Sequence, residues 1–136
     1  MKYQFLEHTA DIKFKAYGKN LEKVFENSAK ALFKVLYKKK VKKKNKRGIK
    51  VKGKDLENLM YNFLEEFLVM FDSENFLPSS IKLKNFNEKK LEISAEVMGD
   101  DAKNYETSSH IKAITYNDMF VKKEGKKFVA QVVIDV

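Results

Sequence analysis

Residues 56–71, LENLMYNFLEEFLVMF, decide how the rest of the chain folds. Large apolar residues recur there at intervals of three and four, at Leu56, Leu59, Met60, Phe63, Leu64, Phe67, Leu68 and Phe71. This spacing places them on one wide stripe, which predicts a helix at the centre of the hydrophobic core. Asp55 precedes the stripe and is the predicted N-cap, because its carboxylate accepts from free backbone N–H groups. Residues 72–75 are expected to end the helix.

A second helix is predicted upstream, from residue 21 to about residue 37. Its apolar face consists of Leu21, Phe25, Ala29, Leu32 and Leu36. Asn20 stands immediately before this face and is the predicted N-cap. Two helices with apolar faces need a further layer to cover them.

Most of the remaining chain alternates apolar and polar residues, which is typical of strands. Strands are predicted at residues 3–7, 12–16, 49–51, 81–86, 90–98, 111–116, 120–123 and 127–135, with turns at 77–79, 87–88 and 124–126. The helices precede a run of antiparallel-looking strands. The sequence therefore predicts an α+β fold in which helices pack on a mainly antiparallel β-sheet, as a single two-layer domain over residues 1–136.

The composition limits where the protein works. A chain of 136 residues can bury a proper core, and the absence of cysteine excludes disulfides and thiolate metal sites. No apolar stretch approaches membrane-spanning length, and the first seven residues are too short and too polar for a secretion signal. A protein without cysteine fits a reducing compartment. We expect a cytoplasmic protein that has no membrane partner.

The positive charge is concentrated in one segment. The net charge is +9, and residues 38–47 carry eight Lys and Arg side chains, so the rest of the chain is near neutral. Like charges repel, which predicts a mobile loop. Two interpretations stay open: a solvated loop, or a loop that binds RNA phosphates with salt-sensitive affinity. The possible RNA contacts are Lys39, Lys42, Lys43, Lys46 and Arg47. Because no aromatic residues are interleaved for bases to stack on, a sequence-specific reader is not expected.

Carboxylates lie at the ends of two predicted strands. Asp11 precedes the second strand, and Asp135 with Val136 closes the last one. Spacing alone favours exposed strand-end aspartates, since charged residues are mostly exposed. The alternative is that Asp11, Asp135 and the Val136 carboxylate converge, because a chain that stops within a strand has an end that can be used. Such a set of oxygen atoms suits a hard cation such as calcium or magnesium.

Three other residues could carry chemistry. His8 and His110 are the only histidines, so a zinc site with several His ligands is nearly excluded. His8 could cap a turn or donate to a carboxylate. Lys112 is a charge in an otherwise apolar strand, where it is either simply exposed or contacts an acidic or phosphate group of a partner.

Several motifs together resemble the archease family. They are His8-Thr9-Ala10-Asp11, FENSAKAL at residues 25–32, IKAITY at residues 111–116 and the final VIDV at residues 133–136. They occur in the family's order, and the resemblance covers nearly the whole chain. Each motif is weak alone, but the combination is specific.

The resemblance implies a small cytosolic α+β protein that is not an enzyme. It implies a protein cofactor of the RtcB-type tRNA-splicing ligase, which promotes guanylylation and multiple turnover of the ligase, and a chaperone-like modulator of RNA processing. tRNA would then be an indirect partner. The metal-binding positions implied are Asp11, Asp135 and the Val136 carboxylate, with calcium as the ion. Lys112 matches a position tied to ligase activation, and His8 is the other candidate for partner contact.

Two departures and two competing functions accompany this interpretation. Asn117 stands where the family often has histidine, and residues 38–47 are Lys-rich where the family usually has mixed charge. One competing function is an RNA-binding accessory domain that acts through this basic loop. The other is a metal-dependent phosphoryl-transfer enzyme built on the carboxylates. The second is poorly supported, because the sequence has five glycines and no phosphate-binding glycine loop.

Overall fold

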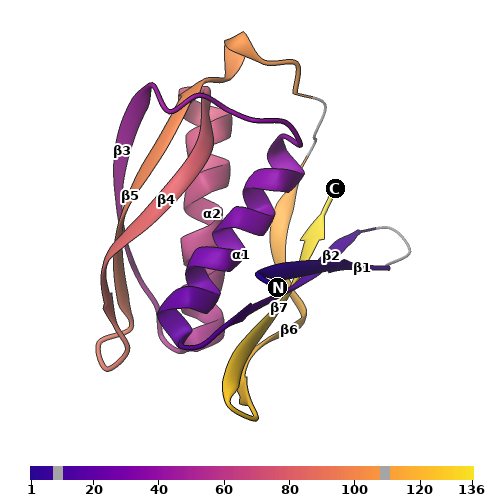
Figure 1. The fold of residues 1–136 in the computed structure, drawn as a ribbon, viewed down its shortest axis with the longest axis vertical. Helices are drawn as coiled ribbons and strands as arrows, with labels where there is room; N and C mark the ends of the chain where they lie inside the picture. The colour runs from indigo at the N-terminus through magenta and orange to yellow at the C-terminus, as the bar shows by residue number, and fades with distance from the viewer. Residues whose placement is uncertain (8–10, 108–110) are drawn as a thin grey trace.

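The computed structural model describes residues 1–7, 11–107 and 111–136. Within these residues, two α-helices lie between a four-stranded sheet of order β1-β2-β7-β6 and a three-stranded sheet of order β3-β5-β4 (Figure 1). The elements in chain order are β1 Tyr3–Leu6, β2 Ile12–Gly18, α1 Leu21–Leu36, β3 Asn45–Lys52, α2 Leu56–Glu74, β4 Phe76–Asn87, β5 Glu92–Asp101, a 3₁₀ turn Ala102–Asn104, β6 Ala113–Glu124 and β7 Lys127–Asp135.

Helix α2 confirms the predicted apolar stripe. Six of its eight stripe residues are buried, and the two at its ends, Leu56 and Phe71, are half-buried. Asp55 is the N-cap, since its Oδ1 accepts from the backbone N–H of Asn58 at 2.8 Å. Asn75 ends the helix in the left-handed conformation, with φ of 52°, which asparagine tolerates better than most residues. The local signals of the sequence and the tertiary burial therefore agree along this helix.

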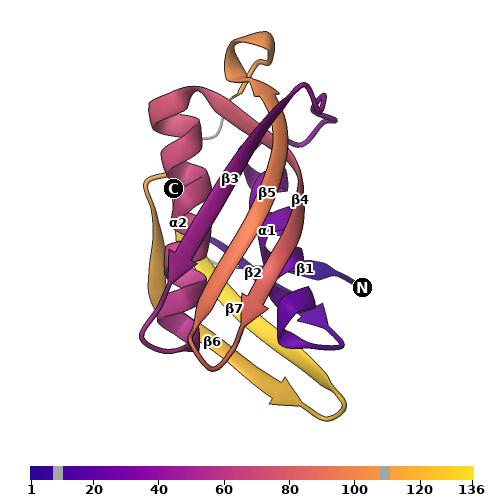
Figure 2. The ribbon, with the colours of Figure 1, turned by 90° about the vertical axis from the view of Figure 1, so that its left-hand side faces the viewer.

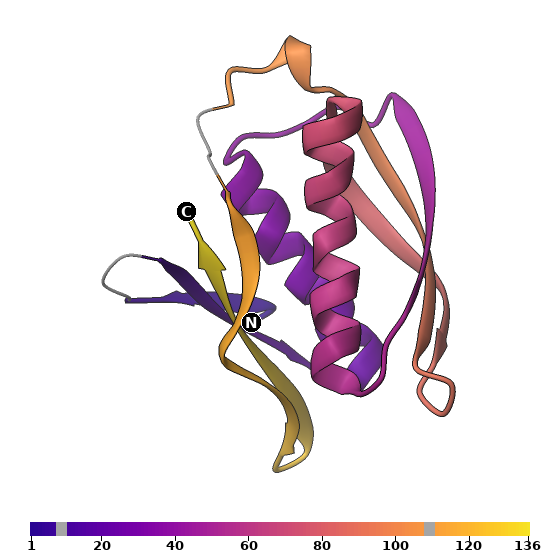
Figure 3. The same cartoon turned by 180° about the vertical axis from the view of Figure 1, so that it is seen from behind.

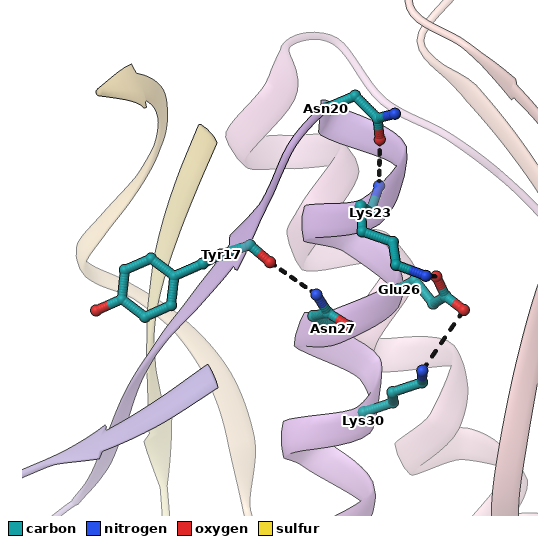
Figure 4. Close-up of polar contacts among 6 residues, drawn as sticks. All are labelled: Tyr17, Asn20, Lys23, Glu26, Asn27 and Lys30. Carbon is teal, nitrogen blue, oxygen red and sulfur yellow. Dashed lines mark hydrogen bonds and ion pairs between the residues drawn. The ribbon is translucent and has the colours of Figure 1, made fainter. Parts of the chain in front are cut away.

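Two asparagines, one before the helix and one within it, fix α1 (Figure 4). The Oδ1 of Asn20 accepts from the backbone N–H of Lys23 at 2.8 Å, which confirms the predicted N-cap. Asn27 is 3% exposed, and its Nδ2 donates to the backbone carbonyl of Tyr17 at 2.7 Å. This bond joins the helix to β2, so a polar side chain fixes how α1 lies on the four-stranded sheet.

The two sheets cover opposite sides of the helix layer. Strands β3, β5 and β4 lie side by side in front of the helices in Figure 2, and Figure 3 shows α2 between this sheet and β6. The predicted α+β class with antiparallel strands is confirmed. The strands form two sheets instead of the one sheet that was predicted. The fold therefore has three layers, with the helices in the middle, where two layers were expected. Both helices present apolar residues to both sheets, which is why a single sheet is insufficient.

Three local predictions are wrong. Residues 77–79 lie within β4 and do not form a turn; Pro78 is tolerated because β4 is an edge strand with a register irregularity between Pro78 and Ser80. The strands predicted at 111–116 and 120–123 belong to one strand, β6, whose pairing with β7 is irregular between Thr115 and Phe120. Strand β3 begins at Asn45, so Lys46 and Arg47 lie in a strand and not in a loop.

Neither of the described helices is long and apolar enough to cross a membrane.

Phe63→Ala is expected to lower the free energy of unfolding by about 3–5 kcal/mol, the usual cost of emptying a buried aromatic site. Phe63 is fully buried, and its ring centroid lies 5.8 Å from that of Phe25 and 5.2 Å from that of Phe67. Val69→Ala on the same helix is the control, since Val69 is 46% exposed and surface truncations usually change stability by about 0.5 kcal/mol or less. Urea unfolding measures both. Equal losses in the two variants would contradict the central place of Phe63.

Candidate functional site

The register of the four-stranded sheet brings three strand ends together. On β2 and β7, Ile12 pairs with Ile134, and on β6 and β7, Ala113 pairs with Asp135. Asp11 precedes Ile12 by one residue, so Asp11 and Asp135 stand at the same edge of the sheet on neighbouring strands. Central β7 therefore places the two predicted carboxylate residues at one end of the molecule.

Lys112 stands on the other side of Asp135. Its backbone N–H donates to the backbone carbonyl of Asp135 at 2.8 Å, while its side chain is exposed. Lys112 also lines a groove of about 320 Å³ with Asp72 and Phe71 from the end of α2. Figure 3 shows the C-terminus, the start of β6 and the last turn of α1 on the same side of the molecule. The predicted activation residue thus flanks the predicted metal-binding residues.

Asp11 lines a larger groove, of about 1060 Å³, between β1, β2 and the C-terminal end of α1. Three lysines line the same groove, at Lys13, Lys34 and Lys38. Asp11 and Asp135 are half-buried, and Val136 is 40% exposed. Lysine and carboxylate side chains therefore line the same end of the fold.

Across the described parts of the chain, no group of three or more His, Cys, Asp or Glu side chains is arranged to hold a metal ion. The predicted set comprises two such side chains, Asp11 and Asp135, and the main-chain carboxylate of Val136. Its donors are all oxygen atoms, which fits a hard cation and not zinc. The metal site therefore stays a prediction that the strand register supports. His8 lies outside the described residues, as do Thr9, Ala10 and His110.

The lysine-rich segment, residues 38–44, is attached at several points where a mobile loop was expected. Val41 is 6% exposed, and its backbone carbonyl accepts from Ser79 Oγ at 2.6 Å. The backbone N–H of Lys42 donates to the hydroxyl of Tyr105 at 2.9 Å, and that of Lys44 donates to the carbonyl of Gly99 at 2.9 Å. Sequence reasoning missed this attachment because one valine among lysines gives no periodic signal.

The five possible RNA contacts fall into two groups. Lys39, Lys42 and Lys43 are exposed on the lysine-rich segment. Lys46 and Arg47 are on β3, where the Lys46 Nζ lies 3.7 Å from Glu96 and the Arg47 Nε lies 3.1 Å from Glu74. The Arg47 guanidinium also lies 4.8 Å from the centroid of the Phe76 ring. The second group therefore already has partners within the fold.

Asp100 and Tyr105 form a polar anchor that the sequence did not reveal. Asp100 is 2% exposed, and its carboxylate accepts from the Tyr105 hydroxyl at 2.8 Å and from the backbone N–H of Asp101 at 2.8 Å. The hydrogen bond from Tyr105 lowers the pKa of Asp100 and outweighs the opposing effect of desolvation. Tyr105 also accepts from Lys42, so one hydroxyl links the end of β5 to the lysine-rich segment. The acidic pair that ends β5 was the only available signal.

Comparison with known proteins identifies the family. The sequence model of the Archease protein family (MTH1598/TM1083) matches residues 3–136. The chain is 40% identical over 138 residues to protein archease of Sulfurisphaera tokodaii and 41% identical over 140 residues to that of Pyrococcus abyssi, with 99% of each chain covered. This chain belongs to the archease family.

Solved structures agree with this assignment. The solution structure of Methanobacterium thermoautotrophicum protein 1598 matches with a TM-score of 0.84 and 32% identity over 99% of both chains. The crystal structure of an archease from Thermotoga maritima, described as a possible chaperone, matches with a TM-score of 0.64 over 96% of this chain and 94% of that one. At 17% identity, the second likeness shows the fold alone.

Tyr105→Phe is expected to speed hydrogen exchange at the Lys42 amide, because the substitution removes the hydroxyl that accepts from it. Tyr116→Phe is the matched control: its hydroxyl accepts from Asn58 Nδ2 at 2.8 Å, away from the lysine-rich segment. Amide exchange followed by NMR measures both variants. Unchanged exchange at Lys42 in Tyr105→Phe would show that other contacts alone hold the segment.

Proposed function

We propose that this chain is a protein cofactor of an RtcB-type tRNA-splicing ligase, and that it promotes guanylylation and multiple turnover of the ligase. Membership of the archease family carries this proposal, since the match spans residues 3–136 and includes the motifs of the resemblance. The role is accessory and not catalytic. It belongs in the cytoplasm, with tRNA reached indirectly through the ligase.

A chaperone-like mode of action suits this role. The Thermotoga maritima relative is described as a possible chaperone. An activator can favour one conformation of its partner only by binding that conformation more tightly than the others. In our proposal the favoured conformation of the ligase is the one that accepts the guanylyl group. The contact surface is the sheet edge that carries Asp11, Asp135 and Lys112.

We assign a hard divalent cation, calcium first, to Asp11, Asp135 and the Val136 carboxylate. The pairing of Ile12 with Ile134 supports this assignment, because it sets the two aspartates on neighbouring strand ends. Bound there, the cation supplies positive charge that offsets the repulsion among the carboxylates. Asp11 and Asp135 hold the site, while the exposed Lys112 offers its ammonium group to an acidic or phosphate group of the partner. His8 is proposed as a second contact.

A phosphoryl-transfer enzyme is the competing class for the same carboxylates. Such an enzyme needs donors that hold the phosphates as well as the metal. Among the described residues, the lysines that line the groove with Asp11 could hold a phosphate, but the sequence offers no phosphate-binding glycine loop. The accessory role therefore accounts for more of the observations.

Asp11→Ala is expected to abolish activation while leaving the fold intact, because it removes one of the carboxylates proposed to hold the cation. Glu88→Ala in the β4–β5 turn is the control, since it removes the same charge from an exposed position. The assay follows transfer of labelled guanylyl from GTP to the cognate ligase, with and without each variant. Full activation of the ligase by Asp11→Ala would contradict the proposed site.

A calcium titration of the protein alone tests metal binding independently of the ligase. Calcium should raise the melting temperature of the wild type and of Glu88→Ala but not of Asp11→Ala, since a ligand that binds only the folded state stabilises it. At a free calcium concentration of 100 times the dissociation constant, the free energy of unfolding should rise by about 2.7 kcal/mol. Loss of activation together with an unchanged calcium response would place Asp11 in the partner contact and contradict the metal assignment.

A further inference from the structure

A third groove, of about 550 Å³, lies between the start of the chain, α1, the lysine-rich segment and the beginning of β4. Its walls carry six lysines from three separate parts of the sequence, and these are Lys2, Lys30, Lys34, Lys39, Lys40 and Lys43. Within the described residues, none that lines this groove is acidic. The concentration of positive charge is therefore a product of the fold and not only of the Lys-rich sequence.

The groove has a fixed wall. Val41 is buried between the lysines that flank it, and Ser79 and Tyr105 both hold the peptide group that joins Val41 to Lys42, as described above. The rings of Tyr37 and Tyr105 meet edge to face with centroids 5.3 Å apart. A segment attached in this way presents its lysines with less ordering entropy to lose on binding.

Lys30 shares its carboxylate partner with a second lysine. Its Nζ is 3.6 Å from Glu26, but the same carboxylate lies 2.8 Å from the Lys23 Nζ (Figure 4). Burial lowers the pKa of Lys30; Glu26 opposes this effect, while the ammonium groups of Lys2 and Lys23 reinforce it. An anion in the groove would relieve the repulsion between Lys30 and Lys2.

The groove also offers aromatic rings and hydroxyls. Tyr3 and Tyr37 line it and are half-buried, and Ser79 and Ser80 line it from the start of β4. Serine hydroxyls and lysines are common donors to nucleic-acid phosphates, and tyrosine rings are platforms on which bases stack. An acidic peptide would use the lysines but would leave the rings without such a role.

We infer that this groove binds the phosphate backbone of a single-stranded nucleic acid, with its six lysines neutralising successive phosphates. The inference goes beyond ligase activation, since binding needs no ligase. It also differs from binding by a loose basic loop, because Lys2, Lys30 and Lys34 lie outside residues 38–47. In addition, three lysines of the lysine-rich segment do not line the groove, and these are Lys38, Lys42 and Lys44.

The test compares two double variants of equal charge change. Lys2→Gln/Lys34→Gln removes two groove lysines from outside the lysine-rich segment. Lys42→Gln/Lys44→Gln removes two exposed lysines of that segment that do not line the groove. Binding of a fluorescein-labelled oligouridylate is followed by fluorescence anisotropy across a series of salt concentrations. Thermal melts check that each variant keeps the stability of the wild type.

The expected result is a loss of tenfold or more in affinity at low salt for Lys2→Gln/Lys34→Gln, and a smaller loss for the control. For single strands the slope of log affinity against log salt is about −0.7 per neutralised phosphate, so the groove variant should lower its magnitude by about 1.4. Equal losses in both variants would overturn the inference in favour of general charge attraction. Tighter binding of poly-glutamate than of oligouridylate would assign the groove to an acidic protein partner and also overturn it.

Discussion

The pairing of β7 with β2 on one side and β6 on the other is the constraint on which the rest of the structure depends. Ile134 is fully buried and pairs with both Ile12 and Ile114. A slip of one residue would turn Ile134 away from the core and Asp135 toward it. Such a slip is disfavoured because burying an unpaired carboxylate costs free energy. The core face of β7, which carries Ala130, Val132 and Ile134, therefore fixes the register, and the register fixes which residues meet at the sheet edge. The position of the Asp11 and Asp135 carboxylates is therefore a consequence of core packing.

The helix layer is likewise fixed by the packing of apolar side chains. Phe25 of α1 and Phe63 of α2 meet with ring centroids 5.8 Å apart, so the helices share one core between the two sheets. Gly53 allows the chain to enter α2 closely, since a Cβ there would lie 2.6 Å from the backbone N of Leu59. A side chain at that position would push the helix away from β3. Small and large residues together thus set the spacing of the layers.

Sequence patterns predicted the elements better than their assembly. The stripe around Phe63 and the caps at Asn20 and Asp55 are local signals, and the helices begin where those signals stand. The division into two sheets depends on which strands pair over long range, and alternation alone carries no such information. The predicted turn around Pro78 was wrong for a related reason. Proline is common in turns, but it is also tolerated on an edge strand, and the sequence alone does not show which strands are at an edge. For the site, spacing alone favoured exposed aspartates, and it was the family resemblance that singled out Asp11, Asp135 and Lys112.

The groove lined by Asp11 and the groove lined by six lysines are neighbours, and this has an electrostatic consequence. Lys34 and Tyr3 line both the groove that contains Asp11 and the groove that contains Lys2. A charged ligand in either groove would therefore act on the ammonium group of Lys34, which the other groove also uses. The fold thus places lysines beside the proposed carboxylate site as well as in the basic groove, and the two grooves meet at the C-terminal end of α1. The positive charge that the sequence concentrates in residues 38–47 is joined, in three dimensions, by Lys2, Lys30 and Lys34 from other parts of the chain.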